Sequence, residues 1–338
     1  MEAWIAGPLA VSDRKASTKQ LYAQLARTHI GQSDLAALPL DRIKPSHIEA
    51  WIAAMRAEGR AASTVRQNYT ILRAILDTAV RDELLGRNPA LAITRPRLES
   101  SEAAYLTPAQ VRALLKAAEV SRYATLFALL VNTGLRRGEA LALRWPDVDL
   151  DKQVLRVRGT LARVNGTLVV TSTKTEKSRR TVPLSGASVT LLEQVRSRQR
   201  HERLRAGSQW TATPFVFTTE LGEPCDPRNA LRALKVAAER AKLDQVGLHT
   251  LRHSAASVML TNGVPLKVVS DVLGHSGIAI TADVYGHVSP DVSRGALTAL
   301  SDALERSLLW CQPWCQVPRF VAIWMGGEGS HLRLYLSG

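Results

Sequence analysis

Residues 249–287, HTLRHSAASVMLTNGVPLKVVSDVLGHSGIAITADVYGH, combine helical apolar spacing with residues that can do chemistry. One helical face would carry apolar side chains, namely Leu251, Ala255, Val258 and Met259. His249 and Arg252, three residues apart, share the opposite face and can point at one ligand. A glycine ends the next apolar run, so His275 is predicted to lie just past a helix end. Tyr285 follows ten residues later, and these groups together predict chemistry on an anion.

The composition favours a partner that carries negative charge. The chain has 338 residues, a normal 46% hydrophobic content and a net charge of +14. Such a charge favours nucleic acid ahead of a membrane, with a merely soluble basic protein as the alternative. Aromatic residues make up only 5% of the chain, which argues against a base-stacking platform and for duplex binding through phosphates.

The cysteines and apolar segments indicate a soluble, cytoplasmic protein. Cys225, Cys311 and Cys315 form no disulfide framework, and the last two lack a second ligand pair for zinc. The N-terminal residues do not read as a signal peptide, and no apolar segment is long enough to span a membrane.

The first ninety residues read as all-helical. Ser46 and Glu49 have capping-box spacing, and Ser63 with Thr64 is predicted to open a longer helix. That helix would bury Val65, Tyr69, Leu72, Leu76 and Val80. Its other face carries Arg66, Gln67, Arg73 and Arg81. This basic face is either a solvated surface or a DNA-backbone contact. Residues 93–105 are polar, contain proline and read as a linker.

The second half of the chain mixes helices with a small sheet. Thr107 and Gln110 predict a capped helix start, and a buried helix over 123–132 is predicted to end at Gly134. Residues 153–173 alternate around Asn165-Gly166, a hairpin signal, and together with 181–184 they predict a three-stranded antiparallel sheet. Helices then resume, the last over 289–308, before an irregular tail at 309–338. The expected fold class is therefore α+β.

Two further charged positions join the opening stretch. Arg136 follows a glycine turn in TGLRRGE, where Glu139 could orient an arginine through a charged hydrogen bond. Lys174 lies at the tip between two predicted strands. Each alone is typical of a solvated surface.

The order Arg136, Lys174, His249, Arg252, His275, Tyr285 resembles the active site of the tyrosine recombinases, the phage integrase family. The resemblance covers residues 106–305, and all six expected positions are filled. It implies an α+β architecture with an all-α core-type DNA-binding domain at 1–92, ending at Asn88-Pro89, and a mainly helical catalytic domain at 106–308.

The resemblance implies that Tyr285 attacks a scissile phosphodiester, leaving a 3′-phosphotyrosyl link and a free 5′-hydroxyl. A phenol with a pKa near 10 is roughly a thousandth ionised at pH 7, so it needs help, and His249 is assigned to accept its proton. Arg136 and Arg252 would clamp the non-bridging oxygens as bidentate donors.

In the same scheme His275 would donate a hydrogen bond to the phosphate, and Lys174 would protonate the departing 5′-oxygen. Because the enzyme stores the phosphodiester covalently, neither a metal nor another cofactor is expected. His253 and His287 are expected to be structural. Arg137, Arg179 and Arg180 are expected to position phosphate or to be solvated.

The implied partners are double-stranded DNA with attachment-type sites, three further copies in a homotetramer, and an excisionase or host DNA-bending factor. The expected role is integration or excision of a prophage or other mobile element. A chromosome-dimer-resolving recombinase is the alternative, although ten residues from His275 to Tyr285 rather than nine lean toward integrases. An inactive DNA-binding remnant and a type IB topoisomerase are the other rivals.

The chain also departs from the family pattern. Its core-binding helices begin within about twenty residues of Met1, so an arm-binding domain ahead of them is expected to be missing or to have been lost from the gene model. Gly277 and Val284 replace residues that are more usual beside the histidine and the tyrosine.

Overall fold

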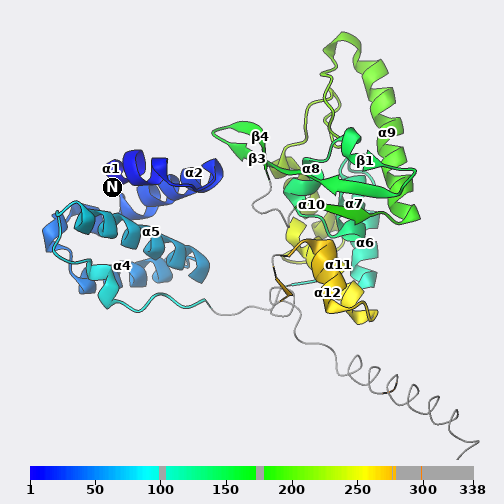
Figure 1. The fold of residues 1–338 in the computed structure, drawn as a ribbon. Helices are drawn as coiled ribbons and strands as arrows, with labels where there is room; N and C mark the ends of the chain where they lie inside the picture. The colour runs from blue at the N-terminus through cyan, green and yellow to red at the C-terminus, as the bar shows by residue number, and fades with distance from the viewer. Residues whose placement is uncertain (99–103, 173–178, 276, 279–297, 299–338) are drawn as a thin grey trace, which may run out of the picture. The chain divides into compact units, whose positions relative to one another are not determined.

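A computed structural model describes residues 1–98, 104–172, 179–275, 277–278 and 298. These residues are mainly helical with short antiparallel strands, which confirms the α+β class (Figure 1). The described helices are α1 (Glu2–Trp4), α2 (Ala16–Leu25), α3 (Asp34–Ala37), α4 (Pro45–Ala57), α5 (Ala62–Arg81), α6 (Pro108–Ala118), α7 (Ala124–Thr133), α8 (Arg137–Leu141), α9 (Gly186–Ala206), α10 (Pro227–Arg240), α11 (Leu248–Thr261) and α12 (Leu266–Leu273). The described strands are β1 (Val148–Asp149), β2 (Val154–Val157), β3 (Gly159–Val164), β4 (Thr167–Ser172) and β5 (Arg180–Pro183). Among the described helices, none is long and apolar enough to cross a membrane.

The N-terminal segment is all-helical, as predicted, and has a hydrophobic core of its own. The apolar face of α5 packs against α4, and the predicted inward residues Val65, Tyr69, Leu72 and Leu76 are buried. The Tyr69 hydroxyl donates to the carbonyl oxygen of Ala90 over 2.8 Å. This bond ties α5 to η4 (Pro89–Ala92), a short 3-10 turn.

Asn88 closes this helical segment with its side chain. Its Nδ2 donates to Oδ1 of Asp77 over 2.6 Å and to the carbonyl of Arg73 over 3.1 Å. Its Oδ1 accepts from the backbone N–H of Ala90 over 2.9 Å. Asn88 therefore caps the 3-10 turn that follows it and attaches this part of the chain to α5.

The predicted capping box at Ser46 and Glu49 is wrong, because α4 begins two residues before the start that this box would give. Pro45 occupies the first helical position, where its fixed φ suits a helix and its missing N–H costs nothing. Lys44 is the N-cap, and its backbone N–H donates to Nδ1 of His47 over 3.3 Å. The histidine takes the reciprocal role that the sequence had suggested for the glutamate.

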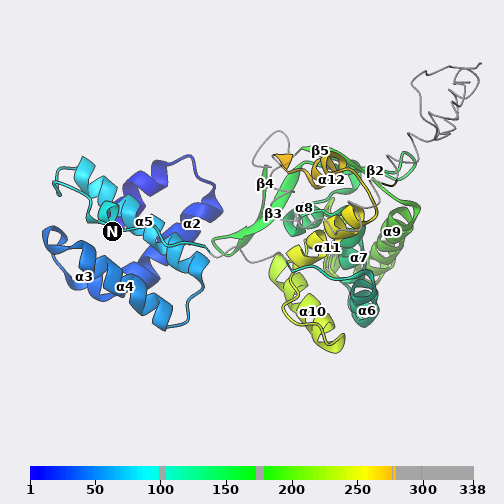
Figure 2. The same cartoon turned by 90° about the horizontal axis from the view of Figure 1, so that it is seen from below.

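A second hydrophobic core is built around α7. Leu126, Phe127, Leu129 and Leu130 are fully buried, and α7 packs against both α9 and α11 (Figure 2). The predicted capping box of α6 is confirmed, since Thr107 Oγ1 accepts from the N–H of Gln110 over 3.3 Å and the Gln110 side chain accepts in return over 2.9 Å.

The strands form two separate antiparallel sheets. One is three-stranded in the order β1-β2-β5, and its Leu155 lies opposite Val182 with both side chains buried. The other is the β3–β4 hairpin, which turns at Asn165 (φ 49°) and Gly166 (φ 81°), as the sequence predicts.

The three-stranded sheet therefore contains different strands from those expected. The predicted alternating segment changes partners at Arg158: β2 pairs with β5, whereas β3 pairs with β4 alone. Burial alternates without interruption across this point, so the period-2 pattern could not mark the change. Arg163 attaches the hairpin to the start of α10, because its Nε donates to Asp226 Oδ2 over 3.0 Å.

Candidate active site

Arg136 is the N-cap of the short helix α8, and the buried carboxylate of Glu139 holds it from two sides. Oε1 of Glu139 accepts from Nη1 of Arg136 over 2.8 Å, and Oε2 accepts from its backbone N–H over 2.9 Å. The Glu139 side chain is 2% exposed, whereas that of Arg136 is 36% exposed. The prediction that Glu139 orients an arginine is confirmed, and the guanidinium keeps a face open to solvent.

Arg252 is buried and joins two helix ends through its guanidinium. From α11, its Nη1 donates to the carbonyl of Gly134 over 2.6 Å and its Nη2 to that of Leu273 over 2.8 Å. Gly134 ends α7 with φ +62°, and a Cβ there would lie 2.5 Å from Cδ2 of Leu273. The glycine lets α7 and α12 approach closely enough for one arginine to serve both.

Arg180 is held in the same network. The sequence predicts that it positions phosphate or is solvated, and the second alternative is wrong. Its Nη2 donates to Oε2 of Glu139 over 3.0 Å, its Nη1 to Oε1 over 3.3 Å, and its Nε to the carbonyl of Val272 over 2.9 Å. Its side chain is 8% exposed, whereas the neighbouring Arg179 is exposed. A charged side chain on a strand can be buried when a carboxylate and a carbonyl oxygen accept its hydrogen bonds.

The C-terminal end of α12 is where the three arginines meet. Three successive carbonyls, those of Val272, Leu273 and Gly274, accept from Arg180, Arg252 and Arg136 respectively. The last of these bonds, from Nη2 of Arg136, is 3.2 Å long. Helix C-termini leave carbonyls without intrahelical donors and carry partial negative charge, so cations are favoured there.

His275 follows directly, as the sequence predicts, and its backbone N–H donates to the carbonyl of Ser270 over 3.0 Å. Burial, then the charges of Arg252 and Arg136, lower the pKa of His275 from 6.5 to about 4. Its imidazole is therefore neutral at neutral pH and can donate one hydrogen bond without carrying a charge.

His249 lies on α11, one turn before Arg252. Its side chain is exposed, yet the protein around it, followed by the charges of Arg137 and Arg252, lowers its pKa below the ordinary histidine value. A neutral imidazole is the form that can accept a proton. His253, half-buried on the same helix, also has a pKa lowered by burial and by His249.

The structure thus brings Arg136, Arg252 and His275 together, with His249 close enough to respond to both arginine charges. Lys174 and Tyr285 lie outside the described residues. The same holds for His287, Val284, the helix predicted over 289–308 apart from position 298, and the tail at 309–338.

The sequence reasoning missed the burial of two side chains in this region. For Arg180 a signal existed: it precedes the core residue Val182 by two, so the strand period places it on the inward face. Ser254 is the other, and its Oγ accepts from the N–H of Leu106 over 2.8 Å and donates to the carbonyl of Thr250 over 2.8 Å. It attaches the start of the second core to α11, and no pattern marks a serine on an apolar face for this role.

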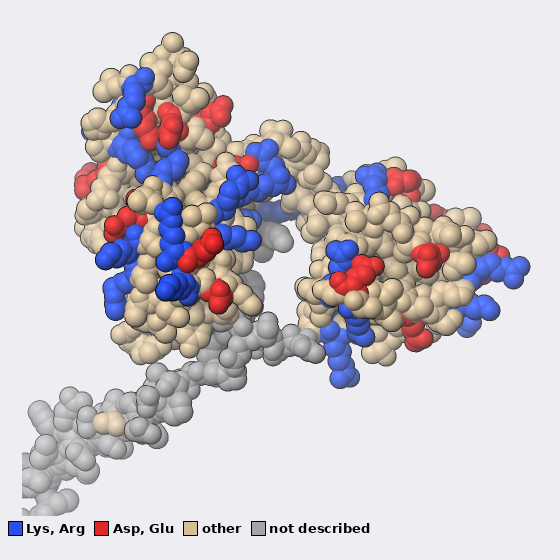
Figure 3. All heavy atoms as spheres, turned by 180° about the vertical axis from the view of Figure 1, so that it is seen from behind, with Lys and Arg blue, Asp and Glu red and all other residues tan. Residues whose placement is uncertain are grey.

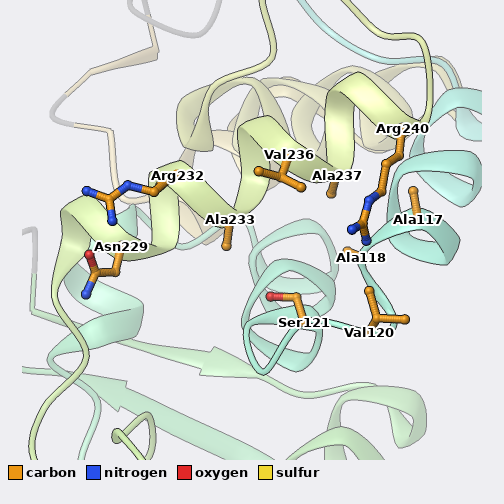
Figure 4. Close-up of a pocket in the computed structure, with 10 residues that line it drawn as sticks. All are labelled: Ala117, Ala118, Val120, Ser121, Asn229, Arg232, Ala233, Val236, Ala237 and Arg240. Carbon is orange, nitrogen blue, oxygen red and sulfur yellow. The ribbon is translucent and has the colours of Figure 1, made fainter.

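A separate pocket of about 380 Å³ lies between α6 and α10 (Figure 4). Its lining is small and apolar with Arg232 and Arg240 along α10, and it holds neither a histidine nor a carboxylate. The residues that line it are Ala117, Ala118, Val120, Ser121, Asn229, Arg232, Ala233, Val236, Ala237 and Arg240. It offers no acid or base, so this pocket is not a candidate for acid–base chemistry.

Comparison with known proteins gives consistent relatives. The model of the phage integrase family matches residues 104–291, more than half of the chain. A tyrosine recombinase XerC-like protein of Caldanaerobacter subterraneus subsp. tengcongensis is 32% identical over 320 residues, covering 89% of this chain and 82% of that one.

Two solved structures share the fold. One is the Tn1549 transposon integrase in complex with transposon right end DNA, with a TM-score of 0.72, 22% identity, and coverage of 88% of this chain and 98% of that one. The other is a lambda integrase tetramer bound to a Holliday junction, with a TM-score of 0.64, 18% identity, and coverage of 86% and 79%.

Proposed function

The chain belongs to the phage integrase family of tyrosine recombinases, and we propose that Arg136, Arg252 and His275 hold one phosphodiester of a DNA backbone during strand exchange. The protein is accordingly a site-specific DNA recombinase, an enzyme that cuts and rejoins DNA. The observation that carries the proposal for the site is the convergence of these side chains at the C-terminal end of α12.

The two arginines have different exposures, and this difference suits different tasks. Arg136 is 36% exposed at its side chain, so its outward face can donate to a non-bridging oxygen while Glu139 holds the other face. Arg252 is nearly buried and fixed by two carbonyls, so it supplies positive charge at a constant position. Preorganised donors of this kind stabilise charge that grows in the transition state.

Tyr285 is the proposed nucleophile. Its phenol oxygen attacks phosphorus, the bond from phosphorus to the 5′-oxygen breaks, and the DNA remains joined to the enzyme through a 3′-phosphotyrosyl link. His249 accepts the phenol proton, a role that its lowered pKa supports, and Lys174 gives a proton to the departing oxygen. Attack by a 5′-hydroxyl from another duplex reverses these steps and frees Tyr285.

We assign residues 1–92 to a helical core-type DNA-binding domain, 93–105 to a linker and 106–308 to the catalytic domain. On the face shown in Figure 3, Lys and Arg side chains are interspersed with acidic ones, so this face alone does not identify the DNA-binding surface. The proposal that duplex DNA is the partner rests instead on the +14 net charge and on the family.

The proposed biological role is integration or excision of a mobile element at attachment-type sites by a homotetramer, assisted by an excisionase or a host DNA-bending factor. The fold shared with a transposon integrase on transposon-end DNA supports the first part. The fold shared with an integrase tetramer on a Holliday junction supports the second. Four strand cuts in two duplexes call for four active sites.

The test is a nicked duplex carrying the attachment site mapped at the ends of the element that holds the gene. The cut strand carries a 5′ label upstream of the scissile phosphate. Wild type should give a labelled covalent adduct on a denaturing gel, because a 3′-phosphotyrosyl link retains the upstream fragment. Tyr285→Phe should give none, and Tyr105→Phe, at an exposed tyrosine, should behave as wild type. Failure of wild type to form the adduct on a verified site would refute the proposal.

A further inference from the structure

The guanidinium group of Arg180 bridges two elements that carry proposed site residues. Nη1 and Nη2 reach the carboxylate of Glu139 on α8, at 3.3 and 3.0 Å. Nε reaches the carbonyl of Val272 at the end of α12, at 2.9 Å. One rigid, planar group therefore fixes the separation between α8, which begins just after Arg136, and the chain that continues to His275.

The three nitrogens of the Arg180 guanidinium all donate to Glu139 or to Val272, so the group is already committed to protein acceptors. Its side chain is 8% exposed, against 36% for Arg136. Gly274 covers it with backbone: a Cβ at Gly274 would lie 2.8 Å from Nη1 and 2.9 Å from Cδ of Arg180. Whatever Arg180 does for the reaction, it does through the groups that it holds.

The carboxylate of Glu139 depends on Arg180 as well as on Arg136. Four donors surround its two oxygens: the backbone N–H and Nη1 of Arg136, and both Nη groups of Arg180. Burial raises the pKa of Glu139, but the hydrogen bond and charge of Arg180, followed by the hydrogen bonds of Arg136, lower it below its ordinary value. Without Arg180, half of the donors that keep this buried carboxylate ionised would be lost.

We infer that Arg180 is a positioning residue for DNA cleavage, tying Glu139 to the end of α12 and so setting where Arg136 and His275 stand. The inference rests on the proposed function of those two residues. It separates the arginines of the cluster into those that meet the phosphate and one that aligns them. Alignment matters because a displacement of about 1 Å can slow a reaction on the order of 10²-fold.

The experiment compares Arg180→Met and Arg180→Lys with Arg156→Met. The control carries the same change at an exposed arginine of β2, the strand that pairs with β5. Single-turnover cleavage of the nicked duplex and its Kd are measured separately. Arg180→Met should slow cleavage on the order of 10²-fold with an unchanged Kd. Arg180→Lys should recover part of the rate, about tenfold below wild type, because an ammonium lacks the fork that reaches Glu139 and Val272 together.

A double-mutant cycle with Glu139→Gln distinguishes positioning from a general structural role. If Arg180 acts through Glu139, the double variant Arg180→Met with Glu139→Gln should be no slower than the slower single variant. The inference is overturned if the effects of the two single substitutions multiply in the double variant, or if either Arg180 variant cleaves at the wild-type rate. It is also overturned if Arg180→Met weakens DNA binding and lowers the melting temperature together with the rate. Should Arg180→Met not fold, Arg180→Lys alone decides, because a wild-type rate would show that the bridge is unnecessary. If wild type itself forms no adduct, the proposed function fails instead.

Discussion

The lowered pKa of His275 predicts a specific loss of stability at mildly acidic pH. In the folded chain burial, then Arg252 and Arg136, lower the pKa to about 4, whereas an unfolded histidine keeps a value near 6.5. Between these values the unfolded chain binds a proton that the folded chain does not. The free energy of unfolding therefore falls as the pH drops below 6.5, and the loss is complete below pH 4.

The magnitude follows from the two pKa values. The difference between 6.5 and about 4, at about 1.36 kcal/mol per pKa unit, gives a full loss of about 3.4 kcal/mol. At pH 5 the unfolded imidazole is almost wholly protonated and the folded one about a tenth protonated, which gives about 2 kcal/mol.

Urea unfolding of wild type and His275→Asn at pH 7.5 and pH 5.0 measures this contribution. Wild type should lose about 2 kcal/mol more than the variant on going to pH 5.0. The loss in the variant is subtracted from that in wild type because the pKa values of His249 and His253 are also lowered. Both histidines therefore also reduce the free energy of unfolding as the pH falls. His201→Asn, at an exposed histidine of α9, should keep the wild-type loss.

An NMR titration of ¹³C-labelled histidines gives the decisive check. The signal that disappears in His275→Asn should titrate near pH 4 in wild type. A midpoint near 6.5 would refute the reasoning, because the arginine cluster would then exert no effect on its neighbour. Inorganic phosphate should move the midpoint upward, since an anion among the guanidinium groups offsets their charge, whereas sodium chloride of equal ionic strength should move it less.

Three further outcomes concern stability and can be measured by urea unfolding. Gly134→Ala should cost about 2 to 4 kcal/mol, from its positive φ and from displacing buried Leu273, whereas Gly59→Ala, with φ +73° and open space, should cost about 1 kcal/mol. Equal losses would contradict the close approach of α7 and α12. Arg252→Ala should cost about 2 to 4 kcal/mol because two buried carbonyls lose a charged donor, and a loss below about 1 kcal/mol would contradict their burial. Tyr69→Phe should lower the free energy of unfolding by about 1 kcal/mol, and no loss would contradict a net contribution from the hydrogen bond of its hydroxyl to Ala90.

Much of the fold can be predicted from local signals in the sequence. The capped start at Thr107, the helix end at Gly134 and the turn at Asn165-Gly166 all depend on neighbours within a few residues, and all are present. The predicted start of α4 is wrong because the sequence holds two overlapping helix-start signals, and the helix begins at Pro45 rather than after Ser46. The change of strand partner at Arg158 could not be read, since alternation is the same whichever strand lies beside it.

The family pattern predicts which residues form the candidate site, but it does not predict the contacts among them. Arg136, Arg252 and His275 were identified because the family pattern orders them along the chain. The pairing of Arg180 with Glu139 spans 41 positions and that of Arg252 with Gly134 spans 118, so neither follows from local spacing. Such contacts depend on how α7, α11 and α12 pack, which hydrophobic periodicity does not specify.

The three carbonyls at the end of α12 also constrain how the length of this helix can vary. Backbone oxygens hold the arginines, so a change of side chain at Val272 leaves its acceptor in place. An insertion or deletion of one residue within α12 is different, because it would rotate the final carbonyls by about 100°. Arg136, Arg180 and Arg252 would then lose an acceptor in a single event. Viable natural variants of this protein should therefore differ in the amino acids of α12 but keep the length of the helix.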